Sequence, residues 1–118
     1  MVIPDARRAV GFASRARGLI GRPPLAETQG FWFDRCAAVH CLGMRYPIDV
    51  VHLGRDDRVL LVAEGVRPWR WSTVRGGRAV LELAAGVARQ SGISPGQVLK
   101  FVRQEPPGFN IETTENTP

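Results

Sequence analysis

The sequence predicts a mostly β fold of the α+β class: a strongly curved antiparallel sheet or a small β-barrel with two short helices. Six or seven short apolar segments have strand-like composition and are separated by turns rich in Gly, Pro and Asp. Only two short segments have a helical pattern. The strands cluster instead of alternating with long helices, which excludes a parallel doubly wound sheet.

The first part of the chain predicts one weak strand and one short helix. Residues 7–12 could form the strand, and Ser14 is a suitable N-cap for a helix over 15–20. Gly21 can end this helix, and the Pro-Pro pair after it prevents continuation. One and a half turns are not stable alone, so this helix must pack on a sheet.

Three strands are predicted in the middle of the chain. Residues 30–33 are aromatic, and residues 39–42 form a short apolar segment that Gly43 interrupts. Residues 48–53 give the clearest strand pattern, with Ile48, Val50 and His52 on one face and the alternate residues on the other. Both faces are mostly apolar, so we expect this strand to be central and covered on both sides.

The return strand follows a polar turn. Residues 54–58 have hairpin composition, and residues 59–62, with an extension to 66 left open, are again apolar on both faces. This spacing predicts an antiparallel pair with 48–53, and Pro68 ends the strand.

The last elements are a loop, two strands, a helix and a turn. Residues 67–78 are basic and aromatic without an acidic residue and are predicted as a loop. A strand over 78–83 and a short helix over 84–91 follow. The residues of 94–97, Ser-Pro-Gly-Gln, fit a type II turn before the final strand, 98–102.

The length of 118 residues predicts one compact β-rich domain over 1–103, and the composition predicts a disordered acidic tail over 104–118. The first residues have no signal-peptide pattern, and no segment is apolar enough for a membrane span. We therefore expect a soluble cytoplasmic protein in which free thiols are ordinary.

The net charge is +5, and all 16 basic residues except Lys100 are Arg. A GC-rich genome explains this bias more simply than nucleic-acid binding does. The 67–78 loop still interleaves Arg with Trp69 and Trp71, and such a loop could stack single-stranded bases or clamp itself to the sheet by cation–π contacts.

Four segments in a particular order and spacing resemble a known family. They are residues 16–22 (Ala-Arg-Gly-Leu-Ile-Gly-Arg), 44–51 (Met-Arg-Tyr-Pro-Ile-Asp-Val-Val), 80–86 (Val-Leu-Glu-Leu-Ala-Ala-Gly) and 92–97 (Gly-Ile-Ser-Pro-Gly-Gln). Over about residues 7–103 the chain resembles the bacterial and archaeal domain of unknown function 192. The resemblance implies a compact, mostly β domain and no established activity.

The cysteines and histidines lie close together in the sequence. Cys36, His40 and Cys41, with His52 further on, are suitable zinc ligands, but their spacing fits no standard zinc motif. In a strand His40 and Cys41 point to opposite faces. We therefore predict no metal and no cofactor, and interpret the thiols as buried; a Cys–His nucleophilic pair stays open as an alternative.

Two carboxylates lie inside apolar strands, at Asp49 and Glu82, and each needs a partner if it is buried. They could form a structural network with an Arg, or a functional site with raised pKa values. The sequence thus predicts a ligand-binding or accessory module, with a small enzyme using Asp49 and Glu82 as the alternative and unknown catalytic residues. The residues of the candidate pocket are Met44, Arg45, Asp49, Glu82, Trp69 and His40.

Overall fold

The structure is a computed structural model. It describes residues 2–3, 5–9, 25–36, 38–40, 46–68, 70–104 and 108–114.

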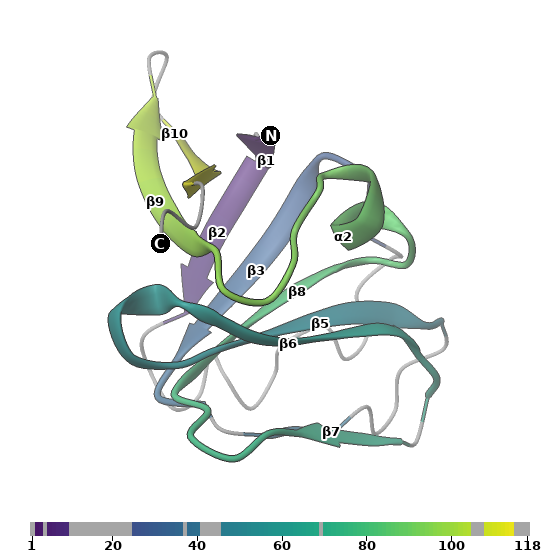
Figure 1. Ribbon diagram of the computed structural model, residues 1–118. Helices are drawn as coiled ribbons and strands as arrows, with labels where there is room; N and C mark the ends of the chain where they lie inside the picture. Colours follow the sequence, from purple (N-terminus) through teal and green to yellow (C-terminus); the bar gives the residue numbers. More distant parts are fainter. Residues whose placement is uncertain are drawn as a thin grey trace.

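A five-stranded sheet forms the centre of the molecule (Figure 1). Its strand order is β2-β3-β8-β5-β6, and every pairing is antiparallel except the parallel pairing of β2 with β3. The strands are β2 (Asp5–Ala9), β3 (Gln29–Asp34), β8 (Ala79–Ala84), β5 (Ile48–Leu53) and β6 (Val59–Val66).

Two smaller sheets accompany it. One has the order β1-β10-β9, and the other pairs β4 with β7. Their strands are β1 (Val2–Ile3), β10 (Gly108–Thr114), β9 (Val98–Gln104), β4 (Ala38–His40) and β7 (Trp71–Thr73). The described helices are the 3-10 turn η1 (Arg55–Asp57) and α2 (Val87–Gln90).

Each face of the five-stranded sheet carries its own apolar core. The first face packs with α2 and with residues of β1, β9 and β10, and Figure 1 shows α2 and the β9–β10 hairpin on this side. The second face packs in a separate cluster built around Phe33, Ile48, Val50 and Val80. Figure 1 shows β7 on this opposite side. All six residues of β5 are buried, as predicted for a strand covered on both faces.

The fold class is confirmed in part. The protein is mostly β with an antiparallel sheet and little helix, but β2 and β6 are edges of the described sheet, so a barrel is not confirmed. The helix predicted over 84–91 is present only as Val87–Gln90, and the helix predicted over 15–20 lies outside the described residues. The expected pair of short helices is therefore not seen.

Two predicted irregular segments contain strands. The 67–78 loop includes β7, which pairs with β4. In the predicted tail, β10 pairs with β9, and Ile111 lies 1% exposed in the core of the first face. Composition missed β10 because a hairpin strand needs few apolar residues when its partner supplies the backbone hydrogen bonds. The organisation as one domain stays a prediction.

Candidate functional site

The carboxylate of Asp49 meets a bulge in the neighbouring strand. The register of β5 with β6 shifts between Ile48 and Val50, so that two residues of β6 oppose Asp49. One of them, Gly65, has φ of +61°, a conformation that favours glycine. Its N–H donates to Asp49 Oδ1 at 2.9 Å.

The other oxygen of Asp49 caps helix α2. The backbone N–H groups of Gly86 and Ala88 both donate to Asp49 Oδ2 at 3.0 Å. Gly86, at the N-cap position, has no side chain for this purpose, so a residue from another strand accepts the bonds that an N-cap normally accepts. With three backbone donors, the fully buried Asp49 holds β5, β6 and α2 together, and we assign it a structural role.

Glu82 lies on the second face of the same sheet. It is opposite Val50 on one side and Phe31 on the other, and it is only 7% exposed. Its buried Oε2 atom has no hydrogen-bond partner within the part of the chain that the structure describes. Because burial disfavours the charged form, the pKa of Glu82 is raised from 4.5 to about 7.

His52 and Ser72 connect β7 to this face. His52 Nε2 and Ser72 Oγ are 2.7 Å apart, and both side chains are buried. Burial lowers the pKa of His52, which favours a neutral imidazole with one donor and one acceptor nitrogen. The other ring nitrogen, Nδ1, is buried without a partner.

His52 and Glu82 are diagonal neighbours on adjacent strands. His52 is opposite Val80, and Val50 is opposite Glu82. Residues in this relation have Cα atoms about 7–8 Å apart, within reach of a single small molecule. Of the described residues, these two carry the only buried side-chain N or O atoms without a partner. The second face therefore combines apolar side chains with these two buried polar atoms, which have no hydrogen-bond partner among the described residues.

The predicted Asp49 and Glu82 pair is wrong as a catalytic pair. Asp49 is opposite Leu83, one position along from the Val50–Glu82 pair, so the two carboxylates point to opposite faces of the sheet. Neither can act jointly with the other on one substrate.

The rest of the predicted pocket is described only in part. Met44, Arg45, Trp69 and the thiol of Cys41 lie outside the described residues. His40 is in β4 opposite Trp71 of β7, but its side chain is not described. The backbone thus places His40 in the small sheet that Ser72 attaches to the second face.

The alternative Cys–His pair is not formed between Cys36 and His52. Cys36 packs with the apolar cluster of the second face. The Nε2 atom of His52 is hydrogen-bonded to Ser72, and Nδ1 has no hydrogen-bond partner among the described residues. In the part of the chain that the structure describes, no three His, Cys, Asp or Glu residues are grouped so as to hold a metal.

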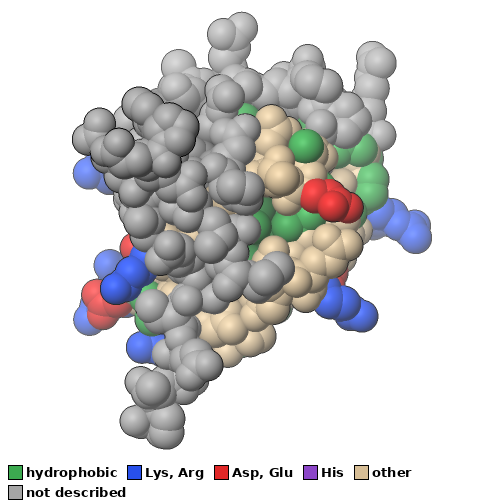
Figure 2. All heavy atoms as spheres, turned by 90° about the horizontal axis from the view of Figure 1, so that it is seen from above, with side chains coloured by type: hydrophobic (Ala, Val, Ile, Leu, Met, Phe, Trp, Pro, Cys, Tyr) green, Lys and Arg blue, Asp and Glu red, His purple; other side chains and the backbone are tan. Residues whose placement is uncertain are grey.

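Among the described residues of the basic and aromatic loop, Trp71 presents an exposed ring, since it is 67% exposed. Figure 2 shows Lys and Arg side chains of the described residues at the rim of the face seen from above.

A family model matches residues 3–101, which span both faces of the sheet and β8 with Glu82. The chain belongs to the domain of unknown function 192 family. The description of this family is "Uncharacterized ACR".

Two solved structures are similar to this family member. A protein of unknown function from Novosphingobium aromaticivorans has 27% identity and a TM-score of 0.70, covering 91% of this chain and 73% of its own. A "putative transcription regulator" from Sinorhizobium meliloti has 24% identity and a TM-score of 0.70, covering 92% of this chain and 80% of its own. No curated protein matches. The second comparison supports the fold alone.

The described residues contain no helix with the length and apolar character that a membrane crossing demands.

Sequence reasoning missed Ser72 altogether. A single Ser inside a basic loop carries no signal, because its role depends on β7 lying against β5. The sequence suggests His52 as a further metal ligand or as a partner of a cysteine, while its position on the same strand face as Val50 is the signal that links it to Glu82.

Replacing Asp49 by Ala should strongly destabilise this member of the domain of unknown function 192 family. Three backbone N–H groups would lose their acceptor, and we expect the free energy of unfolding to fall by about 3–5 kcal/mol. Urea denaturation measures this change. The exposed Asp56→Asn is the matched control and should remain close to wild type. A loss below about 0.5 kcal/mol for Asp49→Ala would contradict the structural role.

Replacing Glu82 by Gln should change how stability depends on pH. With a folded pKa of about 7 and an ordinary value of 4.5, the folded protein binds more protons than the unfolded chain between these values. Wild-type stability therefore falls as pH rises through this window, and Glu82→Gln removes the fall. The variant should gain up to about 3 kcal/mol relative to wild type from pH 4.5 to 8.

Denaturation curves at several pH values measure this effect, with the exposed Glu27→Gln as control. Parallel stability profiles for wild type and Glu82→Gln would show that Glu82 titrates normally.

Proposed function

We propose that this protein is a small-molecule binding module whose ligand donates a hydrogen bond to Glu82 on the second face of the sheet. The observation that carries the proposal is the pair of buried, unpartnered atoms, Glu82 Oε2 and His52 Nδ1, on one sheet face. A buried acceptor without a partner costs about 1–3 kcal/mol, and a bound polar group would recover that energy.

The surroundings of Glu82 suit a compact ligand. Partly buried Phe31, Cys36 and Tyr46 pack with the apolar cluster of this face, so a ligand would meet mostly apolar surface and few polar groups. Small-molecule sites commonly have this composition. Met44, Arg45, His40 and Trp69 remain proposed contributors, but Asp49 is not one, because its oxygens accept backbone hydrogen bonds from β6 and α2.

Glu82 sets the pH dependence of binding. With a pKa of about 7, the carboxyl is mostly ionised above neutral pH, where it accepts hydrogen bonds most strongly. A ligand that donates to Glu82 should therefore bind more tightly at pH 8 than at pH 6.

A bacterial origin and a cytoplasmic location remain predictions from the sequence, as does the alternative of single-stranded nucleic-acid binding through residues 67–78.

A metabolite library should contain at least one compound that raises the melting temperature at pH 8. At about 100 times its dissociation constant a ligand adds about 2.7 kcal/mol. In a domain of this size that corresponds to a shift of more than about 5 °C. Glu82→Gln should abolish the shift, and Glu27→Gln should preserve it.

Equal shifts in wild type and Glu82→Gln would place the ligand elsewhere. No shift from any compound of a broad library would contradict the proposed function.

A further inference from the structure

A charged cavity lies at one end of the central strands, apart from Glu82 and His52. Its volume is about 550 Å³, within the range of about 300–1,000 Å³ that is typical of small-molecule sites. It is lined where β3 and β5 end and β8 begins. The lining residues are Asp34, Arg35, Gly54, Arg55, Asp56, Asp57, Arg78 and Ala79.

Backbone hydrogen bonds fix the frame of this cavity. Arg78 N–H donates to the carbonyl of Leu53 at 2.8 Å, and the Arg78 carbonyl accepts from Cys36 N–H at 2.9 Å. Gly54 N–H donates to the carbonyl of Arg58 at 2.8 Å and closes the η1 turn. The ends of three adjacent strands are thus tied together before any ligand binds, which reduces the entropy that binding costs.

The backbone around the cavity is also unusual. Arg35, Asp56 and Asp57 have φ of 54°, 58° and 57°, and they are the non-glycine residues with positive φ in the described part of the chain. All three line this one cavity. Left-handed conformations of non-glycine residues tend to occur at functional sites, where the surrounding structure holds them.

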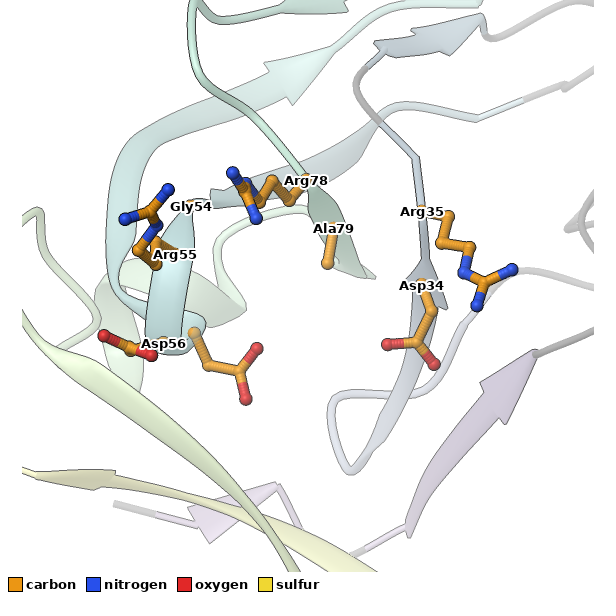
Figure 3. A pocket seen from close by; sticks show the side chains of 8 residues that line it. Asp34, Arg35, Gly54, Arg55, Asp56, Arg78 and Ala79 are labelled. Atoms are coloured by element: carbon orange, nitrogen blue, oxygen red, sulfur yellow. The ribbon is translucent and has the colours of Figure 1, made fainter.

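The charges are arranged on two sides. Figure 3 shows Arg55 and Arg78 on the side of Gly54, Asp34 on the facing side, and Arg35 directed away from the cavity. Within the described residues, neither Arg55 nor Arg78 forms an ion pair or a side-chain hydrogen bond. Two guanidinium groups from different elements can form paired hydrogen bonds to a carboxylate or phosphate. Asp34 can accept a hydrogen bond from the opposite end of a ligand.

We propose that this cavity binds a small anion that also carries a hydroxyl group, such as a polyol phosphate or a hydroxy acid. Arg55 and Arg78 hold the anionic group, and Asp34 accepts the hydroxyl hydrogen bond. The mixed charge of the lining opposes a purely anionic ligand, because Asp56 and Asp57 are carried by the same turn as Arg55. The site uses none of the residues of the proposed Glu82 site.

Nuclear magnetic resonance titration of the full chain tests this proposal with glycerol 3-phosphate, inorganic phosphate and glycerol. Glycerol 3-phosphate should shift the amide signals of Gly54, Arg55 and Ala79 and should bind more tightly than inorganic phosphate. Glycerol should not bind. Arg78→Ala and Arg55→Ala should each weaken binding by about tenfold or more, because each removes charge-assisted hydrogen bonds. Arg75→Ala, an exposed Arg outside the lining, should have no effect.

The variant Asp34→Asn distinguishes the contribution of the ligand's hydroxyl group to binding from that of its phosphate group. It should weaken glycerol 3-phosphate binding and leave inorganic phosphate unchanged or slightly tighter, since a negative charge is removed. The amide oxygen of Asn can still accept from Trp32 Nε1, which donates to Asp34 at 3.2 Å, so this hydrogen bond is kept. The absence of shifts at these amides in millimolar glycerol 3-phosphate would overturn the proposal. An equal loss of affinity in Arg75→Ala would overturn it as well.

Discussion

The buried carboxylate of Asp49 is the interaction on which the arrangement of this domain depends. It accepts backbone N–H groups from Gly65, Gly86 and Ala88, which belong to two different elements. The bulge in β6 and the start of α2 both require this acceptor, and each uses a glycine in the left-handed region to present its N–H. By holding α2 on the first face, Asp49 helps to close the larger apolar core. All of this uses the acceptor capacity of Asp49, so that it serves structure and has little left for a ligand.

The alternation of side chains along a strand gives the second buried carboxylate a different environment. Glu82 lies one register position away from Asp49 across the β5–β8 pair, yet its side chain emerges on the other face. There it lies among apolar side chains, diagonally across from His52, in place of converging backbone donors. Burial without donors raises the pKa of Glu82 to about 7, while the Ser72–His52 bond attaches the β4–β7 sheet beside it. The two faces thus place the two carboxylates in different environments, with backbone donors around Asp49 and apolar side chains around Glu82.

Local patterns predicted β5 and its pairing with β6, because all six residues of β5 are buried and leave a clear apolar signature, whereas β6 is an edge strand that is partly exposed. The turn at 94–97 was predictable too, since Gly96 has the positive φ, 96°, that the sequence Pro-Gly implies. The partners of Asp49 were not predictable: they are backbone groups 16 to 39 residues away, and no side-chain pattern marks a backbone donor. The role of Ser72 and the strand β10 were not predicted for a similar reason, because they depend on tertiary pairing and their composition does not indicate them.

Glu82 is a buried carboxyl group whose Oε2 atom has no hydrogen-bond partner among the described residues, and the proposed ligand would supply a donor to it. The most direct test follows the side-chain carboxyl carbon of Glu82 by ¹³C nuclear magnetic resonance as a function of pH, in the ligand-free protein. The structure predicts a titration midpoint near 7, because burial disfavours the ionised form. A midpoint at the ordinary value of 4.5 would show that water or a protein donor already satisfies the carboxylate, and it would contradict the account.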